Sequence, residues 1–258
     1  MTTIKIQKNA PVGEIILNSP ETLNLIEEDT FQAINQALTS FENDNEIKVV
    51  LLKAICGVSK KTGKKIFSAG VNLNNYEQKF ELLEKNPAKF RENLIKNREL
   101  PDRIEKFTKP IVIGIDGLLI GGFFELALAC DVILASTDAV FSLNEVNLGL
   151  IPGYGGIYRL LRLIGKNKAY EIITTGRQIL PDEALMLGIV TKILPEEEFL
   201  NYCNSLASKP YISLQLVKDT MRRIIEGKDA DEIEVRNFMK AAYSEQARQK
   251  IMAFIDKT

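Results

Sequence analysis

Two glutamates that could carry out acid–base chemistry, Glu125 and Glu145, lie twenty residues apart within residues 109–156. The chain has no histidine, which excludes Ser-His-Asp and Cys-His catalytic arrangements and removes the commonest ligand of catalytic zinc. Proton transfer therefore falls to carboxylates, lysines or tyrosines. We predict that the two carboxylates converge on one polarised site.

The surroundings of Glu125 are apolar, because it lies in the run Phe123-Phe124-Glu125-Leu126-Ala127-Leu128. Burial of an unpaired charge is costly, and a water molecule held between two carboxylates would reduce that cost. A glutamate beside a helix start is also typical of a residue that only stabilises the helix dipole, and this alternative applies to either glutamate taken alone.

The element that carries Glu125 follows from the apolar runs and glycines before it. Ile111–Ile115 is typical of a buried strand, Asp116-Gly117 of a turn, and the leucine-rich segment after Gly121-Gly122 of a helix. The first N–H groups of a helix have no intrahelical partner, and the helix dipole is positive there. A corner of this kind stabilises an anion.

This glycine-led stretch resembles the strand-to-helix turn of the crotonase superfamily, which comprises enoyl-CoA hydratase and its relatives. Residues 121–131 carry the match, and the resemblance places the first catalytic glutamate of the hydratases at Glu125 and the second at Glu145. Residues 149–156 are similar to the segment that closes the hydratase site. The resemblance covers nearly the whole chain.

The resemblance also implies an oxyanion hole made of two backbone N–H groups, those of Val71 and Gly122. Residues 67–73 are similar to the family's oxyanion loop, in which Ala69 would contact the substrate; a simple β-turn is the alternative. Fixed N–H donors stabilise the negative charge that develops on a thioester carbonyl oxygen. Gly153 would help to hold the attacking water.

Four more substrate contacts are expected outside this centre. Lys64 and Lys65 end a loop with four lysines and would suit the phosphates of coenzyme A, although such a loop is more often a solvated turn. The resemblance places Phe238 and Lys257 against the coenzyme A of a neighbouring subunit. The alternatives there are a core phenylalanine and a solvated lysine.

The overall composition is that of an ordinary soluble protein. Of 258 residues, 45% are hydrophobic and 26% charged, and the net charge of −1 argues against nucleic acid as a partner. We expect no membrane span and a cytoplasmic location, since neither a leader-like apolar run nor a stretch of spanning length is found. The three scattered cysteines are interpreted as small hydrophobic residues.

Further elements follow from hydrophobic periodicity. Residues 12–17, 47–55 and 132–135 are apolar runs typical of buried strands, and a helix is predicted between the first two. Pro87 and Pro101 are expected to break residues 76–107 into short helices, which form either a lid over the site or a plain surface connection. After residue 195 the pattern predicts helices only, whose apolar stripes serve either an oligomer interface or an intramolecular core.

We therefore expect an α/β fold with a crotonase-like ββα spiral core in residues 1–195, built on two nearly perpendicular sheets, and a C-terminal helical trimerisation region in residues 196–258. The resemblance implies an enoyl-CoA hydratase of fatty acid metabolism, a hydro-lyase that reversibly adds water in syn fashion to the 2,3 double bond of a 2-enoyl-CoA and gives a 3-hydroxyacyl-CoA. It implies a homotrimer or homohexamer. No metal is expected, and no cofactor beyond the coenzyme A of the acyl-CoA substrate.

Two alternatives stay open. One is a crotonase-fold isomerase, or a dehydratase that acts on a β-branched acyl group bound to a carrier protein. The other is an inactive crotonase-like binding or scaffold protein. In the family, isomerases typically need one carboxylate and inactive members usually lose the glutamates first, so the presence of both Glu125 and Glu145 favours a hydratase.

Overall fold

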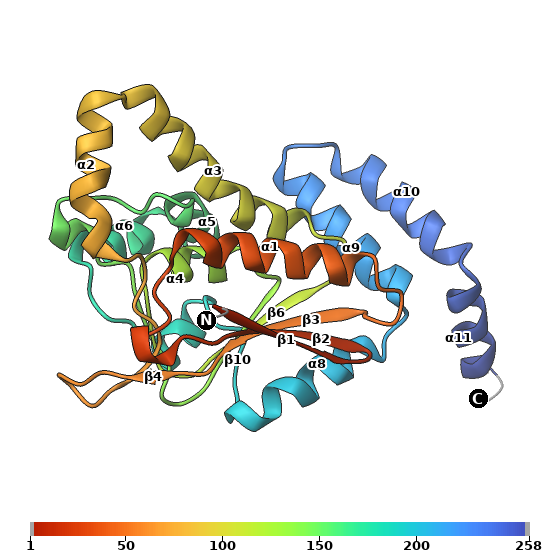
Figure 1. The fold of residues 1–258 in the computed structure, drawn as a ribbon. Coiled ribbons are helices and arrows are strands. Elements are labelled where there is room, and N and C mark those ends of the chain that lie inside the picture. Colours follow the sequence, from red (N-terminus) through yellow and green to blue (C-terminus); the bar gives the residue numbers. More distant parts are fainter. Residues whose placement is uncertain (1–2, 256–258) are drawn as a thin grey trace.

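The computed structural model describes residues 3–255, which form two β-sheets surrounded by helices (Figure 1). The larger sheet has six strands within these residues. In spatial order they are β1 (Ile4–Asn9), β2 (Val12–Leu17), β3 (Val49–Ala54), β6 (Ile111–Ile115), β8 (Val132–Ala135) and β10 (Lys192–Ile193).

The pairing in this sheet is parallel except at one edge. β1 and β2 form an antiparallel hairpin, and β2, β3, β6, β8 and β10 run parallel in that order. Parallel neighbours need a crossover connection, usually a helix, which explains the alternation of strands and helices along the chain. The strands predicted at residues 12–17, 111–115 and 132–135 are confirmed at the same bounds.

A second sheet of four strands within the described residues contains β4 (Gly57–Val58), β5 (Lys65–Ser68), β7 (Leu118–Ile120) and β9 (Val140–Ser142). The strand β7 was not predicted. It occupies the segment between Gly117 and Gly121 that the sequence pattern assigns to a turn, and three residues are too few for a period-2 pattern to be visible. The predicted strand–turn–helix is thus a strand, a turn, a second short strand and a helix.

Helices cover both faces of the larger sheet. Those before residue 210 are α1 (Glu28–Glu42), α2 (Tyr76–Lys85), α3 (Pro87–Lys106), α4 (Gly122–Ala127), α5 (Gly156–Ile164), α6 (Lys166–Thr175), α7 (Pro181–Met186) and α8 (Phe199–Ala207). Figure 1 shows α1 on one side of β1, β2 and β3 and α8 on the other. Alternate residues of β3 face opposite ways, so Val50 and Leu52 join the main core while Val49 and Leu51 pack with Phe199 of α8.

The segment between β5 and β6 forms an arm of two helices, α2 and α3, which projects from the core (Figure 1). The predicted break at Pro87 is confirmed, because α3 begins there and Asn86 caps it. The predicted break at Pro101 is wrong, since α3 continues through it to Lys106. A proline inside a helix costs about 3 kcal/mol. Leu100, Pro101 and Ile104 are all buried, so the packing of this turn against the core offsets that cost.

The chain continues after α8 with three further helices, α9 (Tyr211–Ile225), α10 (Ala230–Ala242) and α11 (Glu245–Ile255). Lys218 fastens α9 to the core, because its ammonium group lies 2.7 Å from Oδ2 of Asp131 and donates to the carbonyl of Ile104 at 3.0 Å. Beyond it, α11 has no buried residue. No helix in residues 3–255 is both long enough and apolar enough to span a membrane.

Candidate active site

The carboxylate of Glu125 lies in a cradle of backbone N–H groups. Glu125 is in the first turn of α4 and is 2% exposed. Its Oε2 accepts hydrogen bonds from the N–H groups of Tyr154 and Gly156, each at 2.7 Å, and its Oε1 accepts one from Gly153 at 3.2 Å. Residues 153–156, part of the segment 149–156 that was expected to close the site, therefore surround this carboxylate, and we refer to them as the 153–156 cradle.

The cradle depends on glycine for space. A Cβ atom at Gly156 would lie 2.6 Å from Cγ of Glu125, closer than side chains tolerate. Gly155 has a φ of +97°, in the left-handed region that favours glycine. The sequence Gly153-Tyr154-Gly155-Gly156 can thus turn its N–H groups towards one carboxylate without a steric clash.

Glu145 begins the short 3-10 helix η3 (Glu145–Leu148) and lies beside the glycine turn that precedes α4. A Cβ atom at Gly121 would be 3.2 Å from its Oε1. Its Oε2 is buried, and within residues 3–255 it has no hydrogen-bond partner. A buried carboxylate oxygen without a partner is costly, so it marks a position for a water molecule or a substrate atom.

Burial dominates the electrostatics of this pair. It raises the pKa of Glu125 to about 7, the three cradle N–H groups act in the opposite direction, and the charge of Glu145 adds to the rise. The pKa of Glu145 is raised as well, again by burial. Two such carboxyls near one another titrate as a pair, and one proton shared between them near neutrality suits a residue pair that must both accept and donate protons.

Val71 and Gly122 present the two N–H groups predicted for the oxyanion hole. Ile26 bonds to the carbonyl of Gly70 and the N–H of Asn72, so the N–H of Val71 between them points away from Ile26. Gly122 is the first residue of α4, where N–H groups lack an intrahelical acceptor. Neither N–H donates to an acceptor within the described residues.

The two loops that carry these N–H groups are in close contact. Gly70 has a φ of +82°, and a Cβ atom there would lie 2.9 Å from the carbonyl oxygen of Ile120 and 3.9 Å from Cα of Gly121. The loop of residues 67–73 therefore packs directly against the end of β7. Ala69 belongs to this contact region, and its N–H donates to the carbonyl of Leu23 at 3.0 Å.

Asn24 holds the loop of residues 67–73 in place, a role that sequence reasoning missed. It is 3% exposed, and its side-chain amide donates to the carbonyls of Phe67 at 2.8 Å and Ile55 at 3.0 Å. The hydroxyl of Ser68 donates to the backbone carbonyl of Asn24 at 2.7 Å. One signal was present in the sequence, an asparagine between two leucines. In the structure this residue has a φ of 48°, a conformation that asparagine adopts more readily than most residues.

Comparison with known proteins decides the family. The sequence profile described as enoyl-CoA hydratase/isomerase matches residues 7–258. The chain belongs to this family. It is 30% identical over 264 residues to the short-chain-enoyl-CoA hydratase of Clostridium acetobutylicum, an alignment that covers 100% of this chain and 96% of that protein. A probable mitochondrial enoyl-CoA hydratase of Dictyostelium discoideum is 34% identical over 207 residues, which cover 80% of this chain and 69% of that protein.

Solved structures of the enoyl-CoA hydratase/isomerase family have the same fold. The crystal structure of the enoyl-CoA hydratase of Bacillus anthracis matches with a TM-score of 0.84 at 27% identity, over 99% of this chain and 97% of that chain. The resemblance to the crotonase superfamily and the α/β crotonase fold with a helical C-terminal region are confirmed.

The two lysines expected to meet coenzyme A lie in different environments. Lys64 is exposed and forms no ion pair within residues 3–255. The ammonium group of Lys65 instead pairs with the buried carboxylate of Asp116 and lies 3.6 Å from Glu196. Lys65 thus has a structural partner already, and only Lys64 is directed wholly to solvent. Their binding role stays a prediction.

The residues expected to contact a neighbouring subunit's coenzyme A lie in the C-terminal helices. Phe238 on α10 is 74% exposed, which is not the environment of a core phenylalanine, and it borders an apolar groove of about 620 Å³ between α9 and α10. Lys257 lies outside the described residues.

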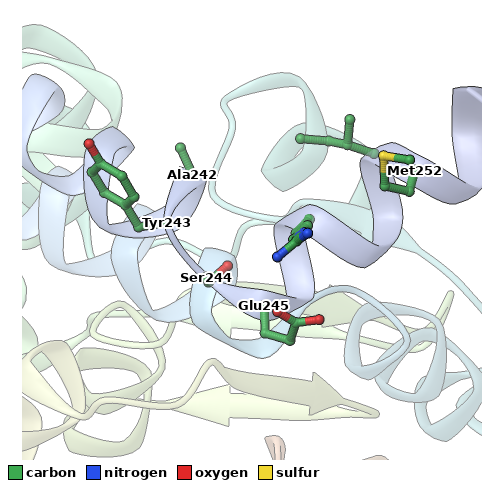
Figure 2. A pocket seen from close by; sticks show the side chains of 7 residues that line it. Ala242, Tyr243, Ser244, Glu245 and Met252 are labelled. Carbon is green, nitrogen blue, oxygen red and sulfur yellow. The ribbon is translucent and has the colours of Figure 1, made fainter.

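A second hollow of about 390 Å³ lies where α10 meets α11, lined by residues such as Tyr243, Glu245 and Met252 (Figure 2). In Figure 1 these helices are at the opposite end of the molecule from α4. Neither hollow is lined by Glu125 or Glu145, so within one described chain the C-terminal region and this glutamate pair are separate surfaces.

Proposed function

We propose that this protein is an enoyl-CoA hydratase, a hydro-lyase that reversibly adds water across the 2,3 double bond of a 2-enoyl-CoA thioester. The family membership supports this reaction class, and relatives at about 30% identity over nearly the full chain are named as enoyl-CoA hydratases. The product is a 3-hydroxyacyl-CoA. The proposed addition is syn, with both carboxylates acting on one face of the double bond.

The proposed mechanism uses two backbone donors and two carboxylates. The thioester carbonyl oxygen binds between the N–H groups of Val71 and Gly122, which stabilise the enolate that forms when C3 is attacked. Glu125, ionised, accepts a proton from the water whose oxygen bonds to C3. Glu145 delivers the proton that bonds to C2. Gly153 lies in the cradle beside the attacking water. Ala69 lies beside the thioester carbonyl of the substrate.

One observation carries the choice of hydration over isomerisation: Glu145 has a buried oxygen without a partner beside the turn that carries Glu125. An isomerase that moves one proton needs one carboxylate, whereas hydration needs a group for the water and a group for the C2 proton. The pKa of Glu125, about 7, leaves an ionised base available near neutrality.

The test is hydration of crotonyl-CoA, which consumes the ultraviolet absorbance of the conjugated thioester. We expect rapid loss of absorbance with the purified chain. Turnover of a 3-enoyl-CoA without hydration would instead identify an isomerase, and binding of crotonyl-CoA without any turnover would identify a binding protein. A carrier-protein thioester compared with the coenzyme A thioester separates the two acyl carriers.

We further propose a homotrimer or homohexamer that acts in the cytoplasm. The exposed apolar residues of α9 and α10 that border their common groove, Val217, Met221, Val235 and Phe238, support association of subunits through this region. Light scattering on the purified protein measures the subunit number, and a monomer at micromolar concentration would contradict the proposal.

A further inference from the structure

A buried arginine, Arg159, connects the 153–156 cradle to the arm of the molecule. It lies on α5 and is 3% exposed. Its Nη1 donates to the carbonyl of Tyr154 at 2.9 Å. Its Nη2 donates to Oδ1 of Asp102 at 2.8 Å and to Oε2 of Glu105 at 2.9 Å, and both carboxylates belong to α3. One guanidinium therefore bridges the cradle and α3.

The atom that Arg159 binds lies within the cradle itself. The carbonyl of Tyr154 is between the two N–H groups, of Tyr154 and of Gly156, that donate to Oε2 of Glu125. Three of the four cradle residues are glycines, which restrict backbone rotation least. A hydrogen bond to this carbonyl fixes the Tyr154–Gly155 peptide plane, which lies between the peptide planes that carry these two donors. It therefore restricts how the donor planes on either side can rotate.

The surroundings of Arg159 form a closed cluster. The guanidinium carbon lies 4.5 Å from the centre of the Tyr158 ring, and the Tyr158 hydroxyl lies 3.1 Å from Oε2 of Glu105. A buried charge is stable only when it is paired and hydrogen-bonded, and this one has two carboxylates, a carbonyl and an aromatic face. Asp102 and Glu105 have no step in the proposed reaction, so their position against Arg159 calls for another explanation.

The arm that carries these carboxylates also leads back to the oxyanion loop. Through η2 (Leu73–Asn75) and α2, the chain runs from Val71 into α3. Arg159 thus connects α3, which follows the loop that carries Val71, to the 153–156 cradle, which holds Glu125.

We propose that Arg159 is a positioning residue that ties the 153–156 cradle to Asp102 and Glu105 and so holds the three N–H donors on the Glu125 carboxylate. This role rests on the proposed function in that it takes Glu125 as the base that activates water. Arg159 itself touches no reacting atom.

The consequence for Glu125 has a definite sign. N–H groups that bond to a carboxylate stabilise its charged form, so a looser cradle raises the pKa of Glu125 further above its ordinary range. Besides Arg159, the charged groups near the cradle in residues 3–255 include Glu145 on η3, Arg162 on α5, and Arg98, Asp102 and Glu105 on α3. Of these, Glu145 raises the pKa of Glu125 by its charge.

The experiment compares Arg159→Met with Arg162→Met. Arg162 is on the same helix and lies 3.7 Å from Glu105, but it has no hydrogen bond to Tyr154 within residues 3–255. We expect Arg159→Met to lower kcat for crotonyl-CoA at least ~10-fold, because small misplacements of a catalytic group are costly. The acid limb of its pH–rate profile should move to higher pH, with KM nearly unchanged. Arg162→Met should behave as the wild type in all three respects.

A second readout needs no activity. Isotope-edited infrared spectroscopy follows the carboxyl band of Glu125, which is assigned by the loss of that band in Glu125→Gln. The pH midpoint of its titration should rise in Arg159→Met. If the wild type hydrates no enoyl-CoA, the proposed function fails while this titration still decides the positioning role. A folded Arg159→Met with the wild-type acid limb and midpoint overturns the proposal.

A third variant covers failure of Arg159→Met to fold. Asp102→Asn keeps the atoms of the bond from Arg159 to Tyr154 and weakens the anchor of Arg159 on α3, where Asp102 also accepts a hydrogen bond from Tyr158. It should move the midpoint in the same direction by a smaller amount, and an unchanged midpoint there counts against the bridge.

Discussion

The backbone N–H of Gly156 donates a 2.7 Å hydrogen bond to Oε2 of Glu125, thirty-one residues earlier in the chain. The same glycine leaves the space that the glutamate occupies, since a Cβ atom there would be 2.6 Å from Cγ of Glu125. Burial favours the neutral carboxyl and this hydrogen bond favours the carboxylate. Their balance gives a pKa of about 7, near the pH at which a general base is most effective.

This balance predicts that Glu125 destabilises the fold at alkaline pH. The folded-state pKa is about 7 and the ordinary value is 4.5, so the folded state binds the proton more tightly. The stability that this contributes is complete below pH 4.5 and is lost as the pH rises through 7. The loss amounts to about 3 kcal/mol. A glutamine does not titrate, so Glu125→Gln lacks this pH-dependent loss. The free energy of unfolding of the variant, relative to that of the wild type, should therefore rise by about that amount between pH 4.5 and pH 8.

Urea unfolding at several pH values measures this difference directly. The comparison across pH cancels any fixed cost of placing an amide among three N–H donors. A Glu125→Gln curve parallel to the wild type over this range would refute the assigned pKa.

The second prediction concerns the roles of the two carboxylates. A positioned acid or base contributes roughly 10²–10⁴ in rate, so Glu125→Gln and Glu145→Gln should each lower kcat by at least ~10². Groups that act in one step are not additive, and the double variant should lose much less than the product of the two losses. We expect Glu125→Gln to retain exchange of a C2 proton of a saturated thioester with solvent deuterium, and Glu145→Gln to lose it.

Proton nuclear magnetic resonance in D₂O follows this exchange. Full hydration by either folded single variant would eliminate the two-carboxylate mechanism. The reverse exchange pattern would swap the two roles and leave the pair intact.

Most of the larger sheet, and the residues proposed for the catalytic centre, could be predicted from the sequence for physical reasons that can be named. Buried parallel strands are continuous apolar runs, which is why Ile111–Ile115 could be delimited to the residue. Val12–Leu17 was delimited as well, although the buried Glu14 interrupts its apolar run. Glycines at a helix start mark a close backbone approach, and Gly121-Gly122 proved to lie beside Glu145 and Tyr154.

The remaining features depend on contacts that no local pattern encodes. The strand β7 is too short for a periodic signal, and Pro101 stays helical because tertiary packing outweighs its local preference. Asn24 and Arg159 act through partners 43 and 57 residues away, Phe67 and Asp102. A single sequence shows the residue type at such positions but not its partner.

Asn24 gives the third prediction. Asn24→Ala should cost at least about 3 kcal/mol of stability, because it leaves the carbonyls of Phe67 and Ile55 and the N–H of Ser19 without their partner. It should also lower kcat, since the oxyanion loop loses its attachment. Asn43→Ala removes a bond to a carbonyl at an exposed helix end and should change stability far less. Thermal unfolding and crotonyl-CoA hydration measure both effects. Equal losses in the two variants would argue against the role of Asn24 in holding residues 67–73.

The fourth prediction separates two adjacent lysines, Lys64 in the loop before β5 and Lys65 at the start of β5. Lys65→Ala breaks the ion pair with buried Asp116 and should lower stability by about 1.5–3 kcal/mol. Lys64→Ala should leave stability within ~0.5 kcal/mol, because Lys64 is exposed and has no ion pair within residues 3–255. If Lys64 meets the phosphates of coenzyme A, its loss should raise KM for crotonyl-CoA several-fold at low salt. The rise should shrink by 0.1 M salt, where the screening length falls to about 10 Å. The crotonyl thioester of N-acetylcysteamine has no phosphate, so its KM should be the same in the wild type and in Lys64→Ala. An equal change in KM for both thioesters, or a change that salt leaves untouched, would assign Lys64 to an ordinary solvated turn.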